Sequence, residues 1–199
     1  MYPFIETIHI EHQQAYELER HLLRMQKTCI EYYNQEKKLN EVQADILHFA
    51  SQTKIKTKLS LHYNIDKHTL LPTIYYQKNI ETFFLIENNE IDYHLKYADR
   101  NSLNQLKLNI KNEDEIIIVK DGKITDTSFS NICFFKQNQW VTPNTPLLNG
   151  IKRQKYLDEK KIISQEIKVE DLFTFEKISL INSLLDLGQS QYDMQSIRF

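Results

Sequence analysis

The chain has 199 residues, of which 41% are hydrophobic and 26% charged, a balance typical of a globular protein with a sizeable core. Its 25 Lys and Arg residues against 27 Asp and Glu residues leave a formal net charge of -2, which argues against a nucleic acid as the main partner. No apolar run approaches the roughly 20 residues that cross a bilayer. The first residues lack the basic and apolar regions of an export signal, so we expect a cytoplasmic protein without a membrane partner.

Several common kinds of site are absent from the sequence. Cys29 and Cys133 have no partner at metal-ligand spacing, so we expect reduced, buried thiols. The seven histidines form no H-x-x-x-H pair, so we expect no zinc site, and no G-x-S-x-G motif supports a hydrolase triad. With only three glycines, the chain has no glycine-rich phosphate loop. A bound phosphate would therefore depend on arginine, hydroxyl groups and helix N-termini.

The first half predicts one strand, two helices and further strands. Alternation of apolar and polar residues over 4–10 predicts a strand. Apolar residues at spacings of three and four predict helices over 16–32 and 39–52. From residue 54 the pattern predicts strands, which we expect at 54–63, 73–76 and 82–86.

The second half alternates differently. We expect a helix over 100–110 and a hairpin of strands 115–120 and 123–127, joined by the strong turn signal Asp121-Gly122. The remaining expected elements are strands at 131–135 and 140–142, a two-proline loop, a helix over 151–161, a short helix over 169–175, a strand over 177–182 and an irregular tail. This order predicts an α/β fold with mixed sheets in two halves: a small N-terminal domain, 1–88, and a larger C-terminal domain, 89–199.

Two places could hold an anion. In Leu148-Asn-Gly-Ile-Lys-Arg153, the amides of Ile151 and Lys152 would be first-turn donors of a helix, which suits a phosphate. An ordinary loop-to-helix connection with an incidental glycine explains the same residues. Arg24, one of five arginines against 20 lysines, could bind an anion through two nitrogens, or lie on a solvated helix face.

Two further residues could carry chemistry. Lys96 is flanked by Leu95, Tyr97 and Ala98, and an apolar setting would lower the pKa of its amine and make it a usable nucleophile or base. Most lysines are instead simply solvated. Asp126 precedes a run of hydroxyl and amide side chains that ends at Asn131, and turn chemistry explains such a run equally well.

In order along the chain, these fragments resemble the class IV aminotransferase family of pyridoxal phosphate (PLP) enzymes. Phe4-Ile-Glu-Thr-Ile8 resembles the opening F-E-T-I strand of the family, His21-Leu-Leu-Arg24 its H-x-x-R helix, and Lys96-Tyr-Ala-Asp-Arg100 its Schiff-base lysine segment. The stretch from Asp114 to Phe134 resembles the D-E…D-G…N-[IL]-F block. Further matches are Trp140-Val-Thr-Pro143, the G-I-x-R element at Gly150–Arg153, and Ile181-Asn-Ser-Leu184. The resemblance covers nearly the whole chain.

The resemblance implies a two-domain architecture of fold type IV, with PLP as cofactor, an amino-acid-like small molecule as substrate and a homodimer as assembly. It also implies roles for individual residues. Lys96 would bind the cofactor covalently and act as acid and base. Arg24, the amides of Ile151 and Lys152, and Ser183 would bind the phosphate. Asp126 would pair with the pyridinium nitrogen, and Asn131 would belong to the same cofactor-binding set.

Two departures from the family pattern concern these roles. Residue 126 is Asp where the family usually has Glu, a side chain shorter by about 1.5 Å, so the contact with the ring could be shifted or mediated by water. The chain also begins at the F-E-T-I strand, without the segment that usually precedes it and helps to line the pocket, so we expect the difference to affect the substrate side.

The resemblance leaves three functions open. The short chain resembles the aminodeoxychorismate lyase branch, which releases 4-aminobenzoate and pyruvate in folate biosynthesis, and we favour this function. A class IV aminotransferase acting on branched-chain or D-amino acids is the alternative. A non-catalytic dimeric member of the family is the third, and only the Asp at position 126 supports it.

Overall fold

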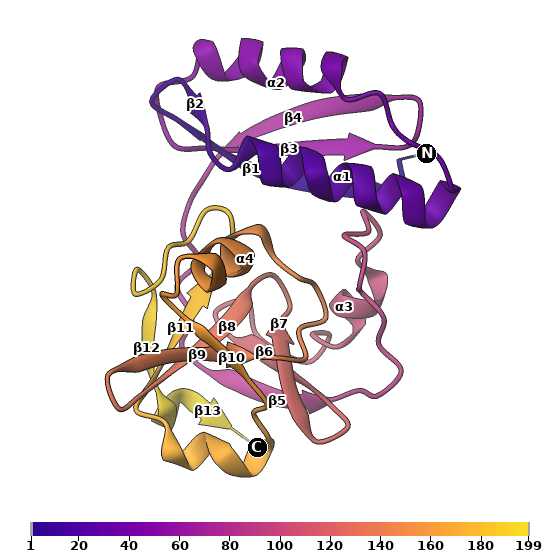
Figure 1. Cartoon of the computed structure of the whole chain (residues 1–199). Helices are drawn as coiled ribbons and strands as arrows, with labels where there is room; N and C mark the ends of the chain where they lie inside the picture. The colour runs from indigo at the N-terminus through magenta and orange to yellow at the C-terminus, as the bar shows by residue number, and fades with distance from the viewer. Residues whose placement is uncertain (1, 199) are drawn as a thin grey trace. The chain divides into compact units, whose positions relative to one another are not determined.

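The structure is a computed structural model that describes residues 2–198. It divides the chain into two compact units (Figure 1). The first contains the chain up to Tyr76 together with Leu95–Asp99, and the second contains Gln77–His94 and the chain from Arg100 onwards.

This division differs from the predicted boundary after residue 88, and backbone pairing explains why. Strand β5, Phe83–Glu87, pairs in parallel with β6, Glu115–Lys120, and so belongs to the second unit. The backbone N–H of Ile5 donates a hydrogen bond to the carbonyl oxygen of Lys96 at 3.0 Å. Lys96 therefore lies in the first unit, and not in the larger C-terminal domain where we had expected it.

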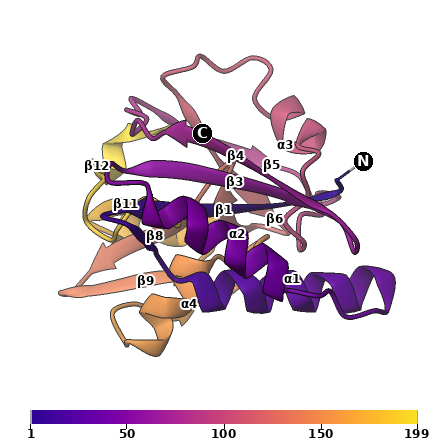
Figure 2. The same cartoon turned by 90° about the horizontal axis from the view of Figure 1, so that it is seen from above.

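The first unit is a sheet of order β2-β1-β3-β4, antiparallel throughout, with two helices. Figure 2 shows both helices running across the sheet. The strands are β1 (Phe4–Glu11), β2 (Gln14–Ala15), β3 (Thr57–Tyr63) and β4 (His68–Ile74); the helices are α1 (Leu18–Tyr33) and α2 (Asn40–Ser51).

Side-chain alternation decides which face of this sheet the helices cover. On β3 the residues from Thr57 to Tyr63 alternate strictly between buried and half-buried. The buried set packs with apolar residues of α1 and α2 into one cluster, which includes Phe4, Ile8, Leu59, Leu61, Met25 and Ile46. The other face of the sheet carries the intervening side chains.

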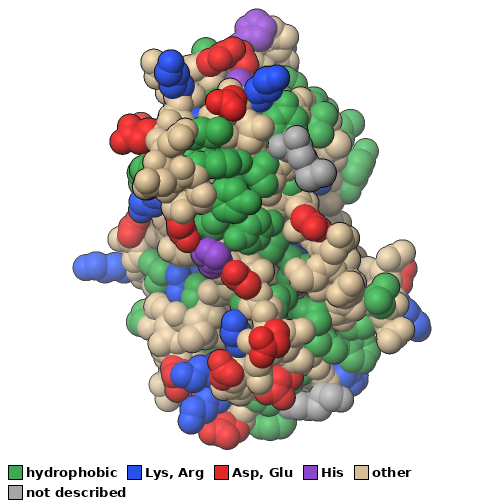
Figure 3. All heavy atoms as spheres, turned by 90° about the vertical axis from the view of Figure 1, so that its right-hand side faces the viewer, with side chains coloured by type: hydrophobic (Ala, Val, Ile, Leu, Met, Phe, Trp, Pro, Cys, Tyr) green, Lys and Arg blue, Asp and Glu red, His purple; other side chains and the backbone are tan. Residues whose placement is uncertain are grey.

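Not all large apolar side chains of the first unit are buried. On α1 the side chains of Leu23 and Tyr32 are 54% exposed and that of Ile30 is 44% exposed. Figure 3 shows hydrophobic side chains gathered on one face of the upper part of the molecule. The amphipathic pattern that predicted α1 is thus correct, but its apolar stripe is wider than the buried one.

The second unit is built on a mixed sheet of order β10-β9-β8-β7-β6-β5-β13, with β11 joined to β8 and β12 to β11. Besides β5 and β6, its strands are β7 (Lys123–Thr127), β8 (Asn131–Lys136), β9 (Gln139–Pro143), β10 (Ile163–Gln165), β11 (Lys177–Ile181), β12 (Gln191–Asp193) and β13 (Ile197–Arg198). Its helices are α3 (Asn101–Gln105) and α4 (Ile151–Asp158), with 3₁₀ turns at Val169–Thr174 and Met194–Ser196.

The predicted mixed α/β architecture is confirmed, with differences at the ends of elements. The expected helix over 100–110 stops at Gln105, because only Leu103 on it is buried and Leu108 is 77% exposed. The strand expected at 73–76 is β4, which begins at His68 because it pairs with the whole of β3. The tail expected to be irregular contains β12 and β13, and we missed the short strands β2 and β10.

Two smaller predictions also have outcomes. Both cysteines are free and buried. Within residues 2–198 no helix has both the length and the apolar character that a bilayer span requires.

Candidate functional site

A buried carboxylate lies at the centre of the first unit. Glu6 on β1 is fully buried and accepts two hydrogen bonds from Arg24 on α1, one of them from Nε at 2.8 Å. Burial alone would raise the pKa of Glu6, but the charge and hydrogen bonds of Arg24, together with the bond from His21, lower that pKa to about 2. The pair is therefore ionised throughout the physiological range.

His21 completes this group from one turn earlier on α1. Its Nδ1 lies 2.6 Å from Oε2 of Glu6, and its side chain is fully buried. Since an ionised carboxylate only accepts, Nδ1 carries the proton and donates it. Burial, together with the charges of Arg24 and Lys96, lowers the pKa of His21, while Glu6 opposes the shift. We call Glu6, His21 and Arg24 the Glu6 cluster.

Lys96 lies beside this cluster at the edge of the same sheet. The segment around it pairs with the start of β1, where Phe4 stands opposite Tyr97. The charge of Lys96 acts on His21, so the lysine is within electrostatic reach of the Glu6 cluster. The structure thus brings Arg24 and Lys96, two of the predicted site residues, into one neighbourhood.

A second buried carboxylate, Asp126 on β7, lies in the second unit. Its Oδ1 accepts a hydrogen bond from Nδ2 of Asn131 at 2.7 Å, and its Oδ2 accepts one from the backbone N–H of Leu148 at 3.0 Å. Burial raises the pKa of Asp126 to about 6, although these hydrogen bonds and the charge of Arg153 oppose the rise. In the part of the chain that the structure describes, the groups that donate hydrogen bonds to this carboxylate are thus neutral.

Asn131 links Asp126 to the loop before α4. The same Nδ2 also donates to the carbonyl oxygen of Leu148 at 2.9 Å. A Cβ atom at position 150 would lie 2.1 Å from Oδ1 of Asn131, so glycine is required here for the loop to approach. Gly150 is therefore not incidental: it lets the two chain segments pack closely beside Asp126.

Helix α4 begins directly after this glycine. Its N-cap, Gly150, has no side-chain capping bond, so the first-turn amides at Ile151 and Lys152 have no side-chain acceptor from the cap residue. The Lys152 ammonium lies 2.6 Å from Oδ1 of Asp186, which follows the turn containing Ser183. Asp126, Asn131, Ile151 and Lys152 thus lie along one connected stretch of the second unit, and Ser183 lies three residues before a direct contact of Lys152.

The structure identifies residues near these sites to which we had assigned no role. Glu6 and His21 belong to the F-E-T-I and H-x-x-R motifs of the sequence. The position of Glu6, an acid on the same strand face as Phe4 and Ile8, could have indicated a buried carboxylate. Arg153 anchors the loop: one Nη donates to the carbonyl oxygen of Pro143 at 2.9 Å and the other to Oδ1 of Asn149 at 3.1 Å. No sequence pattern short of the folded loop could have indicated these long-range contacts.

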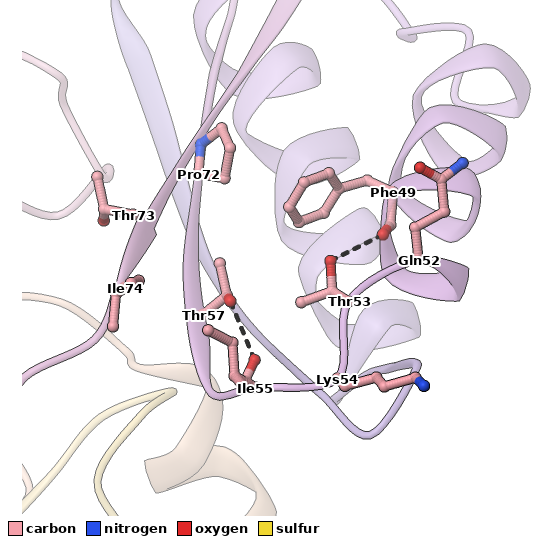
Figure 4. A pocket seen from close by; sticks show the side chains of 9 residues that line it. All are labelled: Phe49, Gln52, Thr53, Lys54, Ile55, Thr57, Pro72, Thr73 and Ile74. Carbon is pink, nitrogen blue, oxygen red and sulfur yellow. Dashed lines mark hydrogen bonds between the residues drawn. The ribbon is translucent and has the colours of Figure 1, made fainter.

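Two other hollows lie away from these residues. A groove of about 460 Å³ lies in the first unit. In Figure 4 Phe49, near the end of α2, faces Pro72 of β4, and Thr57 lies at the start of β3. A second, of about 370 Å³, lies in the second unit beside the Asp121-Gly122 hairpin and includes Asp92, His94 and Lys120. None of the predicted site residues lines either hollow.

Comparison with known proteins relates the whole chain to one family. Residues 4–189 match the family model described as amino-transferase class IV. An uncharacterised protein of Haemophilus influenzae is 34% identical over 191 residues, covering 92% of this chain and 98% of that protein.

Solved structures agree with this relationship. The crystal structure of a "putative 4-amino-4-deoxychorismate lyase" from Haemophilus somnus has a TM-score of 0.86 and 37% identity, over 94% of this chain and 98% of that one. A hypothetical aminotransferase from Mycobacterium tuberculosis in a PLP-bound form has a TM-score of 0.78 over 98% of this chain and 81% of that one. At 14% identity, the latter likeness concerns the fold alone.

Proposed function

Since the chain belongs to the class IV aminotransferase family of PLP-dependent enzymes, we propose that it is an aminodeoxychorismate lyase that releases 4-aminobenzoate and pyruvate. The observation that carries this proposal is the 37% identity to the Haemophilus somnus protein named for that reaction, over nearly the full length of both chains.

The residues present fit PLP. Its phosphate needs oriented donors, and α4 begins with amides that no N-cap side chain satisfies. Its ring nitrogen needs an acidic partner, and Asp126 is a buried carboxylate whose hydrogen-bond donors are neutral. When bound, PLP withdraws electrons from the carbon that carries the substrate amino group.

We assign the covalent attachment of PLP to Lys96. Its amine also takes the proton from the carbon that bears the substrate amino group, which requires a neutral nitrogen. The Glu6 cluster lies beside it, with its own charges already compensated by the Glu6–Arg24 pair.

We assign the phosphate to Arg24, the amides of Ile151 and Lys152, and Ser183. Two nitrogens of Arg24 are held by Glu6, which fixes the plane of the guanidinium. An oriented guanidinium loses less conformational entropy on binding a phosphate than a mobile one does.

We assign to Asp126 the contact with the pyridinium nitrogen of PLP, and to Asn131 the orientation of the Asp126 carboxylate. The hydrogen bond from Asn131 to Oδ1 and that from Leu148 to Oδ2 hold the carboxylate at both oxygens. A cation placed against this buried group would lower its pKa, so each charge stabilises the other.

The lyase reaction balances without a second substrate. Lys96 removes the proton from the ring carbon that bears the amino group, and the enolpyruvyl ether leaves from the adjacent carbon. The ring becomes aromatic 4-aminobenzoate, and the departing enol takes up a proton to give pyruvate. No keto acid is consumed, which distinguishes this reaction from transamination.

The test is an assay of the purified holoenzyme with aminodeoxychorismate, measuring 4-aminobenzoate and pyruvate in equal amounts. A panel of D- and L-amino acids with 2-oxoglutarate runs beside it. Equimolar products without a keto acid support the lyase. Turnover only with an amino acid and 2-oxoglutarate would instead assign an aminotransferase.

We further propose that the enzyme is a cytoplasmic homodimer that serves folate biosynthesis. The 11 tyrosines and 10 phenylalanines of the chain would suit a large subunit interface. Light scattering at micromolar concentration tests the assembly, because a single species near the chain mass of 23.9 kDa would contradict a dimer.

A further inference from the structure

Lys96 shares a face of the first unit's sheet with a small group of polar side chains. Phe4 and Tyr97 stand directly opposite each other in an antiparallel bridge, so they share one face, and their rings lie 5.7 Å apart. That face is the one that packs with the helices. Since successive side chains alternate, Ile5 and Lys96 begin on the opposite face.

Strand register extends this face from Lys96 across the sheet. Ile5 pairs with His62 of β3, and Thr7 pairs with Ser60. Neighbouring strands are about 4.8 Å apart and residues two apart on a strand about 6.7 Å, so Thr7, Ser60 and His62 lie about 8–12 Å from the Lys96 backbone. A substrate of the size of an aromatic amino acid spans that distance.

The chemistry of the three side chains is uniform. Two hydroxyls and one imidazole offer hydrogen-bond donors, and within residues 2–198 none of the three side chains makes a hydrogen bond or ion pair. All three are half-buried. An ordinary solvated sheet face usually mixes both charges, but here the nearest acid on β1, Glu6, faces the helices and is engaged by Arg24.

The other acid of β1 does not reach this group. Glu11 is at the far end of the strand, where its carboxylate lies 2.9 Å from Nε2 of His9. Lys58 of β3 adds a positive charge on the same face, because it lies two residues from Ser60. Hydroxyl and imidazole groups that can donate, together with the positive charge of Lys58 on the same face, favour an anionic group.

We propose that Thr7, Ser60 and His62 bind the carboxylate of the substrate that does not react, while the amino end is at Lys96. The proposal rests on the proposed function only in taking Lys96 as the reacting residue. In 4-aminobenzoate the carboxylate lies across the ring from the amino group, so both ends would be recognised at once. The subsite would thereby select substrates with a second anionic end.

The test compares binding of 4-aminobenzoate with that of its neutral analogue 4-aminobenzamide, by calorimetry on the PLP-loaded protein. The variants are Thr7→Val, Ser60→Ala and His62→Phe, with His62→Gln as the variant that keeps a donor. Thr73→Val is the matched control, because Thr73 is on the same face but on the outermost strand. A parallel titration uses 2-oxoglutarate.

We expect each of the three variants to weaken binding of 4-aminobenzoate about tenfold, the value of one hydrogen bond to a charged group, with little change for the amide. His62→Gln should recover part of the loss, and Thr73→Val should behave as wild type. Equal affinities for acid and amide in the wild type, or variants that bind both as the wild type does, would overturn the subsite.

The outcomes also separate this proposal from the proposed function. If the holoenzyme fails the lyase assay while the three variants still weaken binding of 4-aminobenzoate, the anionic subsite stands and the lyase assignment falls. If borohydride labels Lys96 but acid binding is indifferent to all three variants, the lysine keeps its role and the subsite is wrong.

Discussion

The two units contain buried carboxylates with opposite electrostatic settings. Glu6 in the first unit is held by Arg24 and His21, and its pKa is lowered to about 2. Asp126 in the second unit is held by an amide side chain and a backbone N–H, and its pKa is raised to about 6. Burial opposes ionisation at both places, so the difference comes from the partners.

This difference indicates what each carboxylate can still do. Glu6 has its cation within its own unit, so its contribution is to orient Arg24. Within residues 2–198 no cation contacts Asp126, so an ionised Asp126 gains from a positively charged ligand atom such as a pyridinium nitrogen. The first site is complete in itself, whereas the second is suited to a cationic partner.

The largest expected effect on activity concerns Lys96, which lies near the Glu6 cluster. Lys96→Ala should lower turnover about 10²–10⁴-fold, the contribution typical of a positioned acid–base group. Borohydride reduction of the PLP-loaded wild type, followed by peptide mapping, should place the pyridoxyl group on Lys96. Lys54→Ala, a change at an exposed lysine of the same unit, is the control. Labelling at any other lysine would remove Lys96 from the site.

Breaking the compensated pair should be the next largest change. Glu6→Gln leaves Arg24 without its buried counter-charge and should lower the free energy of unfolding by about 3–5 kcal/mol. In the wild type, a depressed pKa means that this stabilisation is present above the ordinary pKa of 4.5 and is lost as the pH falls towards 2. Urea unfolding at several pH values measures both.

Glu11→Gln is the matched control for that change, because Glu11 is on the same strand but is partly exposed and pairs with His9 and His12. We expect it to cost about 0–1 kcal/mol. If Glu6→Gln lowered the free energy of unfolding as little as Glu11→Gln does, the Glu6 cluster would be an incidental contact. The two buried carboxylates would then no longer differ in the way described above.

The sequence predicted local features well, because their signals are local. The hairpin at Asp121-Gly122 is present: both residues have positive φ, and Lys120 pairs with Lys123 across the turn. Arg24 was open to interpretation as a solvated helix residue, which the structure excludes, since its side chain is 13% exposed and bonded to Glu6. That contact joins residues 18 positions apart, and no periodicity in the helix reports it.

The unit to which Lys96 belongs could not be predicted either. Its motif follows β5 in the chain, so the boundary was expected before it, but one short bridge to β1 returns the segment to the first unit. The Asp126 side chain was expected to reach less far toward the cofactor ring than the Glu that is usual in the family. The structure adds that Leu148 and Asn131 meet its carboxylate, which an analysis of turn residues alone could not reveal.

Asp126 should make the free energy of unfolding depend on pH in the sense opposite to that of Glu6. The unfolded chain releases the Asp126 proton near its ordinary pKa of 3.8, while the folded protein keeps it to about 6. The folded state therefore binds more protons between these values, and the free energy of unfolding should fall by up to about 3 kcal/mol as the pH rises from 4 to 6. Unfolding of PLP-free protein measures this slope.

Asp126→Asn should remove that slope, although its amide nitrogen cannot accept one of the two hydrogen bonds that the carboxylate receives. Bound PLP should also diminish the slope in the wild type, because a cation at the ring nitrogen lowers the pKa of Asp126. In the Asn variant PLP should still bind but turn over slowly. An Asn variant with full PLP and wild-type turnover would assign Asp126 to structure only.

The smallest expected effect comes from Arg24, and the Glu6 pair determines which substitution is informative. Arg24→Ala would leave Glu6 buried without a cation, so lost stability and lost phosphate binding would be confounded. Arg24→Lys keeps a positive charge beside Glu6 but removes the planar, two-nitrogen geometry. We expect it to weaken PLP affinity about tenfold, or about 1.4 kcal/mol, with a smaller loss of stability.

Arg20→Lys is the control on the same helix, since Arg20 is 33% exposed and pairs with Glu17 at 3.4 Å. Fluorescence titration of PLP into the apoprotein, without borohydride reduction, measures the affinity. Thermal unfolding of the same samples measures the stability. If Arg24→Lys lowers stability but binds PLP as the wild type does, Arg24 serves Glu6 alone, and the phosphate must be bound by donors of the second unit.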